Sequence, residues 1–154
     1  MKKSDAHILL DPEDAWLLET NWRVKDGYAY RKIYTHKVRK SPRFKDIPFH
    51  RIIMGLGHGS VDKRQVDHIN RNKLDNRRDN LRVVSKAQNA QNVGAQRRNK
   101  SGLRGAQLHK PSGRWRAIVR KDGRLISLGY HDTPQAAYER ALAYRREHMP
   151  FAID

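Results

Sequence analysis

Four side chains in the middle of the sequence have the types and spacing of a hydrolytic metal site. Asp67 and His68 are adjacent, Asn80 follows twelve positions after the histidine, and Asn89 nine positions after that. Carboxylate and carboxamide oxygens are hard ligands that suit Mg²⁺ or Mn²⁺. A neutral imidazole, with an ordinary pKa of about 6.5, can take a proton from water near neutral pH. The set predicts metal-assisted hydrolysis with one divalent ion.

The segments around these residues predict the elements that must position them. Residues 66–68 and 81–84 are expected to be partner strands, and residues 69–79 a loop rich in Asn, Asp and Arg. Such a loop is too long for a tight hairpin, which usually indicates function. The sequence Ser85-Lys86-Ala87-Gln88 is a capping box that starts a helix, with Asn89 and Asn92 on one face.

This spacing, together with the phrase LDNRRDNLR, resembles the HNH endonuclease family in the variant whose last histidine is asparagine. The resemblance implies a ββα-metal fold that hydrolyses phosphodiester bonds of DNA. It also implies that His68 is the general base and that Asp67 and Asn89 hold the metal. Asn80 would pin the loop backbone and so orient His68. Asparagine in the last position argues against zinc.

Other residues near this motif have more than one interpretation. A single Asp-His pair in a polar loop is usually plain surface, so the prediction depends on all four residues together. His50, in the phrase FHRIIMG, and His58 could contact DNA or the metal, although a structural role is more common. The stretch MGLGHGS predicts a turn and not a phosphate loop, because no Lys-Ser or Lys-Thr follows it.

The charge of the whole chain indicates a polyanionic partner. Its 154 residues include 33 Lys and Arg against 16 Asp and Glu, a net charge of +17. That surplus indicates phosphate binding, a membrane surface or poor solubility. We expect no membrane partner, because no apolar run approaches the roughly 20 residues of a span and no signal-peptide stretch is present. The absence of cysteine excludes disulfides and cysteine-type zinc knuckles.

Residues 1–48 predict a small strand-rich module. Strands are expected at 8–10, 22–24 and 28–34, the last two around the turn Lys25-Asp26-Gly27. The sequence Asp11-Pro12-Glu13-Asp14 is expected to open a short helical stretch. The basic run at 36–45 predicts a loop, either a solvated hairpin tip or a phosphate contact. The nuclease core is expected to follow over 49–92, beginning with an apolar run suited to burial.

The C-terminal part predicts a sheet backed by one helix. A basic linker at 93–102 either lies along a DNA groove or is an unbound tether. Within 103–150, strands are expected at 103–108, 115–120 and 125–130, and Thr133 and Pro134 start a helix. The side chains predicted to face this helix are Trp115, Ala117, Val119, Ile126 and Leu128.

The opposite face of that sheet is expected to enter a major groove of DNA, with guanidiniums reaching base edges or phosphates. The sheet sequence resembles the plant ethylene-response-factor (APETALA-type) DNA-binding domain in the motifs RG, GRW and LG and in the AAY helix. It departs from that family at Ile118, Leu125 and Ser127, so direct base reading could be thinner. The alternative is an Arg-rich face that only keeps the protein soluble. The residues expected to contact DNA are Arg97, Arg98, Lys100, Arg104, Gln107, His109, Arg114, Arg116, Arg120 and Arg124.

The sequence as a whole predicts an α+β protein. Its arrangement resembles phage-type homing endonucleases, which implies a cytoplasmic enzyme of a bacterium or a phage-infected cell. We expect a monomer that cuts double-stranded DNA and needs no small-molecule cofactor. The main alternative is a non-catalytic DNA-binding regulator on a decayed nuclease scaffold. An RNA-binding protein is a third possibility, although aromatic residues for stacking on single strands are sparse.

Overall fold

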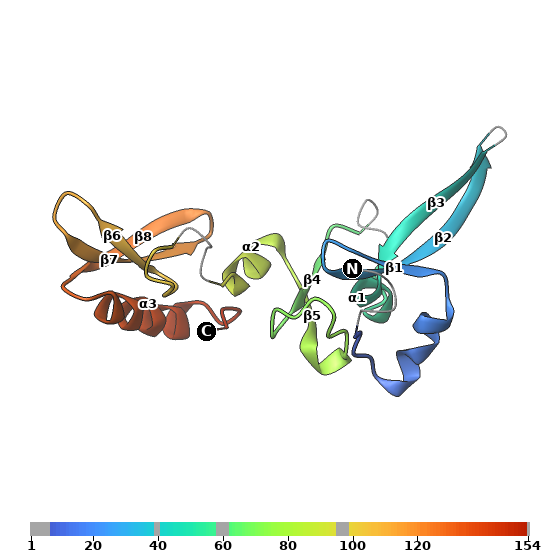
Figure 1. Ribbon diagram of the computed structural model, residues 1–154, viewed down its shortest axis with the longest axis horizontal. Helices are drawn as coiled ribbons and strands as arrows, with labels where there is room; N and C mark the ends of the chain where they lie inside the picture. Colours follow the sequence, from blue (N-terminus) through green and yellow to red (C-terminus); the bar gives the residue numbers. More distant parts are fainter. Residues whose placement is uncertain (1–6, 39–40, 58–61, 95–98, 154) are drawn as a thin grey trace. The chain divides into compact units, whose positions relative to one another are not determined.

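The computed structural model describes residues 7–38, 41–57, 62–94 and 99–153 (Figure 1). The chain has an α+β fold of small sheets and short helices, as the sequence predicted. It divides into two compact units, Met1–Ser85 and Lys86–Asp154, each described by itself below. Within the described ranges, no helix has both the length and the apolar character needed to cross a bilayer.

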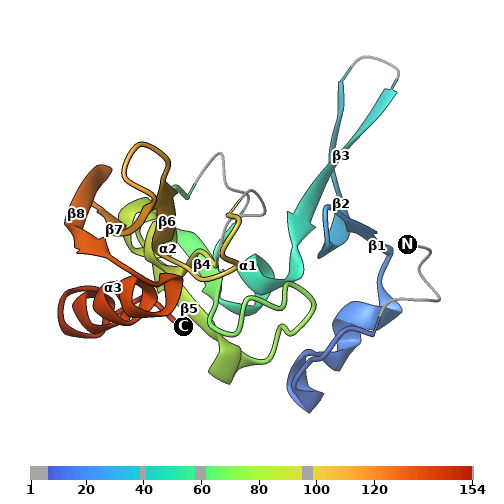
Figure 2. The same cartoon turned by 60° about the vertical axis from the view of Figure 1, so that its left-hand side comes forward.

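The first unit contains a three-stranded antiparallel sheet in the order β1 (Trp22–Lys25), β2 (Tyr28–Val38), β3 (Ser41–Pro48). Asp26 and Gly27 between β1 and β2 both have positive φ, as the tight Asp-Gly turn requires. The strands predicted at 22–24 and 28–34 are therefore confirmed. The loop predicted at 36–45 is wrong, because the described residues of that run pair as β2 and β3. They form a hairpin that extends away from the rest of the unit (Figures 1 and 2).

Helical segments flank this sheet. The predicted helical stretch after Asp11 is a 3₁₀ helix, η2 (Pro12–Glu19). The predicted strand at 8–10 is reduced to one parallel bridge between Leu9 and Asp75. The apolar run after β3 forms α1 (Phe49–Ile53), whose Phe49 and Ile53 are buried.

One hydrophobic core spans the first unit. It contains Leu17, Trp22, Ala29, Phe49, Ile53, Leu56, Val66 and Leu81. Arg78 adds a polar link, since its guanidinium donates to Asp14 Oδ1 at 2.9 Å and to the Ile53 carbonyl at 3.2 Å. The segments predicted as a module at 1–48 and a nuclease core at 49–92 thus share one core. Chains as short as either segment bury a smaller fraction of their surface than longer chains do when they fold alone.

The predicted partner strands of the motif are confirmed as β4 (Gln65–His68) and β5 (Leu81–Val84). They pair antiparallel, and the register places Asp67 opposite Arg82 and His68 opposite Leu81. The loop between them ends in a short 3₁₀ helix, η3 (Arg78–Asn80). The motif's carboxylate and imidazole therefore lie at the end of a strand whose partner leads back from the loop.

The second unit begins with α2 (Lys86–Asn89) and η4 (Ala90–Asn92). These residues are bound to the C-terminal part of the chain. The guanidinium of Arg104 donates to the backbone carbonyls of Gln91 and Ile153, and the Gln91 side chain accepts from the Phe151 amide. The compact units thus divide at Ser85, whereas the sequence predicted that the nuclease core would extend to residue 92.

The main body of the second unit is the antiparallel sheet β6 (Ala106–His109), β7 (Arg114–Lys121), β8 (Arg124–His131), in that order. Helix α3 (Pro134–His148) covers one face of it (Figure 1). Thr133 caps this helix by accepting from the Ala136 amide at 3.1 Å, as predicted. The predicted inner face is also confirmed, since its residues pack with Ala137 and Ala141 of α3. The alanines let the helix approach the sheet closely.

A bulge in β8 changes which side chains face outward. Arg116 pairs with Tyr130 and Ile118 with Ser127, so β8 carries one residue more than β7 between these pairs. Gly129 in this stretch has φ +106°, a backbone conformation that glycine adopts without strain. Strict alternation from Ile126 and Leu128 would turn Tyr130 inward. The bulge instead places it opposite Arg116, with its side chain exposed.

The close approach of α3 leaves no room for a side chain at one glycine of the second unit. Gly105 has φ +90°, and an added Cβ would lie 2.7 Å from Ala141 Cβ and 2.8 Å from the Ile118 carbonyl oxygen. We expect Gly105→Ala to lower the free energy of unfolding by about 1–3 kcal/mol, because overpacking a tight contact costs that much. Thermal and urea unfolding of the full chain measure this effect.

Gly113→Ala is the matched control, since Gly113 has φ +67° but no heavy atom within 4 Å of an added Cβ. It should show backbone strain alone and a smaller loss of stability. Equal losses for the two variants would mean that the contact with α3 does not constrain residue 105.

Candidate active site

Asp67 and His68 are buried side by side at the end of β4, with 7% and 5% of their surfaces exposed. The cross-strand partner of Asp67 compensates its charge, because Arg82 donates to Asp67 Oδ2 from Nε at 2.9 Å and from a terminal nitrogen at 2.7 Å. A buried carboxylate without such a partner would be strongly destabilising. The strand register thus fixes where this carboxylate lies.

The imidazole of His68 faces a carboxamide that the sequence prediction missed. Asn76 Oδ1 lies 3.3 Å from His68 Nε2, and Asn76 is 1% exposed. Its backbone amide donates to the Leu9 carbonyl at 2.8 Å, so the N-terminal segment holds it in place. Its Nδ2 is buried and has no hydrogen-bond partner among the described residues. Asn76 belongs to the phrase LDNRRDNLR, which is the signal that could have found it.

Asn80 holds the loop between β4 and β5 from its far end. Its Oδ1 accepts from the Asn70 amide at 2.9 Å, and its Nδ2 donates to the Asp75 carbonyl at 2.8 Å. The buried Asp75 carboxylate also accepts from Arg77 and Asn70, and the hydrogen bonds from Arg77 hold its pKa below the ordinary value. These are the loop contacts expected of Asn80. Its effect on the orientation of His68 stays a prediction.

Two further rings enclose His68. The centroids of His50 and Tyr28 lie 5.0 Å and 5.9 Å from that of His68, and 5.3 Å from each other. Burial, with the nearby His68 and Arg51, lowers the pKa of His50 to about 3, so this imidazole is neutral at ordinary pH. Burial also lowers the pKa of His68, although Asn76 and Asp67 oppose the shift. His68 is therefore unprotonated near neutral pH, the form that a general base requires.

The structure bears on the two interpretations of His50, a DNA or metal contact or a structural role. His50 packs in the wall of the site with its Nδ1 buried and without a hydrogen-bond partner among the described residues. That environment fits the structural interpretation better than a DNA contact. His58 lies outside the described residues, so its predicted alternatives stay predictions.

The donors of the first unit fit a hard divalent ion better than zinc. No group of three or more His, Cys, Asp or Glu side chains within the described ranges is arranged to hold a metal. Asp67 supplies a carboxylate oxygen, a ligand suited to Mg²⁺ or Mn²⁺, which keep several waters and need few protein ligands. Catalytic zinc sites instead use three His, Cys, Asp or Glu ligands, and structural ones four. The second predicted ligand, Asn89, is the last residue of α2 in the other unit.

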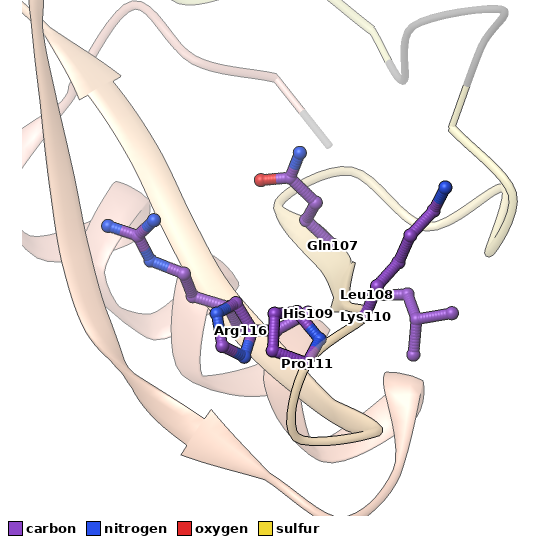
Figure 3. A pocket seen from close by; sticks show the side chains of 6 residues that line it. All are labelled: Gln107, Leu108, His109, Lys110, Pro111 and Arg116. Atoms are coloured by element: carbon purple, nitrogen blue, oxygen red, sulfur yellow. The ribbon is translucent and has the colours of Figure 1, made fainter.

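The outer face of the C-terminal sheet is the candidate surface for DNA. Gln107 and Arg116 are cross-strand partners, and Arg116 Nε donates to Ser127 Oγ at 2.9 Å. His109 packs against the exposed Tyr130 with ring centroids 5.0 Å apart. A hollow of about 390 Å³ is lined by Gln107, Leu108, His109, Lys110, Pro111 and Arg116 (Figure 3). Tyr130 is an addition to the outward residues expected from the sequence.

The remaining predicted DNA contacts differ in their surroundings. Lys100 and Arg124 are exposed, and Arg120 is exposed with one hydrogen bond to the Gly123 carbonyl. Arg114 is exposed but paired with Asp132 at 3.0 Å. The guanidinium of Arg104 binds the carbonyls of Gln91 and Ile153, which argues against its predicted DNA contact. Arg97 and Arg98 lie outside the described residues.

Comparison with known proteins identifies one part of the chain. A family model described as HNH endonuclease matches residues 48–91. The matched segment contains Asp67, His68, Asn76 and Asn80 together with Asn89, and it supports an HNH nuclease that acts on DNA. No curated protein and no solved structure matches the chain.

The contact between Asn76 and His68 leads to a prediction about the imidazole tautomer. Since an amide oxygen only accepts hydrogen bonds, the hydrogen of the neutral ring should reside on Nε2. We expect imidazole ¹⁵N shifts of histidine-labelled protein to show this tautomer for His68. Asn76→Ala should give a mixture of tautomers and a kcat about 10²-fold lower, the lower end of what a general base contributes, with KM little changed.

Asn76→Asp is the conservative variant, because it retains an acceptor at the same position. It should keep the Nε2–H tautomer and recover part of the activity that Asn76→Ala loses. An Nδ1–H tautomer in the unaltered protein would show that the amide donates to His68, the reverse of the arrangement described above.

Proposed function

We propose that this protein is a metal-dependent, homing-type DNA endonuclease that hydrolyses phosphodiester bonds. The observation that carries the proposal is the match of residues 48–91 to the HNH endonuclease family, within which Asp67 and His68 are buried together at the end of β4. Asn76 and the loop held by Asn80 surround the imidazole. Hydrolysis needs a base, a hard metal ligand and a rigid loop, and the residues for all three lie in this segment.

The chain's own residues divide the chemistry among them. His68 accepts the proton of the attacking water at Nδ1, because Nε2 faces Asn76. Arg82 orients the Asp67 carboxylate, which would supply one ligand to Mg²⁺ or Mn²⁺, and Asn89 stays the second ligand predicted from the sequence. Such an ion neutralises charge on the phosphate and assists departure of the 3′ oxygen. The rings of His50 and Tyr28 pack against this imidazole and help to hold its orientation.

The second unit would supply affinity and site preference for double-stranded DNA. Its outer sheet face presents Gln107 and Arg116 as neighbours, with Arg120 farther along the same strand. Guanidiniums on such a face can bind guanine edges or phosphates in a major groove. This use of the sheet follows the resemblance to the ethylene-response-factor domain. We propose that the protein works as a monomer, with the nuclease segment and the reading face on one chain.

One observation favours a second candidate, a DNA-binding regulator on a decayed nuclease scaffold. The Asp67 carboxylate is bound by Arg82, and no cluster of three metal-binding side chains is present in the described part of the chain. In that case the C-terminal sheet would still bind DNA but no cutting would follow. A cleavage assay separates the two candidates directly.

Incubation of supercoiled plasmid with Mg²⁺ or Mn²⁺, resolved on a gel, tests the proposal. We expect nicked or linear product from the unaltered protein and none in EDTA. His68→Ala should lower the rate about 10²- to 10⁴-fold, the contribution of a general base, while DNA binding is kept. Asp67→Asn should raise the metal concentration needed for half-maximal cutting.

His148→Ala is the control for the loss of a histidine, because His148 lies at the end of α3 in the other unit. It should cut like the unaltered protein. Cutting in EDTA would refute the metal requirement. DNA binding without any cutting would favour the regulator.

Base reading by the outer sheet face is tested at Arg116. If its guanidinium contacts a base, Arg116→Ala should cost about 1–3 kcal/mol at one position of the target and relax preference there. Selection of cleaved sites from a random library measures this preference. Arg140 is exposed on α3, the helix that covers the opposite face of the sheet. Arg140→Ala therefore removes the same charge and should leave the site preference unchanged. Identical site profiles for the two variants would exclude Arg116 as a base contact.

A further inference from the structure

One face of β2 carries a row of aromatic and cationic side chains. Successive residues of a strand point to opposite faces, so Tyr28, Tyr30, Lys32 and Tyr34 share one face. Ala29, on the other face, is buried in the hydrophobic core, which places the row on the side away from that core. The row, together with Phe44 of β3, is called the β2 track below. Neither the HNH motif nor the C-terminal sheet includes any of these residues.

Ring contacts connect most of the β2 track, beginning at the candidate base. The Tyr28 ring lies 5.9 Å from His68 and 6.4 Å from Tyr30. Farther along, Lys32 Nζ lies 4.4 Å from the centroid of Phe44, whose ring is 5.7 Å from that of Tyr34. The track thus begins at His68 and continues onto the hairpin that extends away from the unit (Figure 2).

The outer end of the track is open. Tyr34 is 50% exposed and Phe44 49% exposed, and they are cross-strand partners. A cross-strand aromatic pair stabilises a hairpin by only about 0.2–1 kcal/mol. Stabilisation of the hairpin can explain the pair Tyr34–Phe44. It does not explain why the same face also carries Tyr30 and Tyr28, which lead to His68.

Charge indicates which occupant this face suits. Lys32 lies over Phe44, and Lys73 Nζ lies 4.3 Å from the centroid of Tyr28, so ammonium groups are present at both ends. Asp46 of β3 lies directly opposite Lys32 on this face, and its charge is compensated by Arg23, the cross-strand neighbour of Tyr30. Aromatic rings interspersed with cations suit the backbone of a DNA strand, because rings can pack against the sugars while cations bind the phosphates.

We propose that the β2 track binds the backbone of the DNA substrate on one side of the phosphate that is cut. This inference rests on the proposed nuclease function and extends it to a second DNA contact, separate from the C-terminal sheet. The stretch from residue 28 to residue 34 spans about 20 Å, which is enough to follow roughly six base pairs. It leads the DNA towards His68 from the hairpin side.

The hairpin contains a matched pair of lysines for the test. Lys32 lies on the track, whereas Lys45 is exposed and pairs with Ile33, whose side chain belongs to the opposite face. Lys32→Ala and Lys45→Ala remove the same charge from the same hairpin. Fluorescence anisotropy with a labelled duplex of mixed sequence, repeated over a range of salt, reports affinity and the number of phosphates contacted.

We expect Lys32→Ala to weaken duplex binding and to reduce the slope of log affinity against log salt by about 0.9, the value for one phosphate contact. Lys32→Arg should restore both, and Lys45→Ala should change neither. The double variant Tyr34→Ala with Phe44→Ala should weaken binding about fivefold, because the sugars lose their apolar contact, while the salt slope is kept. Circular dichroism on each variant verifies that the fold is retained.

Equal effects of Lys32→Ala and Lys45→Ala would overturn the proposal, because affinity would then depend on total charge and not on the track. Unchanged binding by Lys32→Ala and by the aromatic double variant would do the same. These readouts use binding alone, so they stand whether or not the protein cuts plasmid. Absence of cutting would refute the nuclease function without deciding the role of the track.

Discussion

The burial of a carboxylate and an imidazole side by side is the constraint on which the first unit depends. Asp67 and His68 lie at the end of β4, where isolated polar groups would be costly to bury. Antiparallel pairing with β5 brings Arg82 opposite Asp67, and the loop between the strands brings Asn76 to His68. Arg82 and Asn76 come from the strand pair and its loop, so the register of this hairpin sets two of the contacts of Asp67 and His68.

The N-terminal segment makes that hairpin part of a stable unit. Two four-residue strands bury little by themselves, and a two-stranded hairpin is marginal in water. Leu17 and Trp22 complete the core with Phe49 and Leu81. Leu9 binds the backbone on both sides of Asp75, and so positions Asn76. A segment that looks like an added module in the sequence is thus required to form the surroundings of His68.

The second unit is stabilised by close packing of a helix on a sheet. Small residues at the interface, Ala117 against Ala137 and Gly105 against Ala141, let α3 lie close to the sheet. Larger apolar side chains such as Trp115 and Leu128 pack around this close contact, and the outer face carries charge. The bulge at Gly129 adds an aromatic ring to that charged face. The sheet thus has one face buried under α3 and one polar, positively charged face, as antiparallel sheets commonly do.

The sequence by itself determined the local features of both units. The bounds of β5, the end of β4 at His68 and the cap at Thr133 follow from alternation and capping chemistry, which act between near neighbours. Tertiary structure alone decided the pairing of Asp67 with Arg82, the contact of Asn76 with His68 and the division of the chain at Ser85. It also turned the predicted basic loop at 36–45 into paired strands. These outcomes depend on strand register and on shared cores between distant segments, which no periodicity in the sequence encodes.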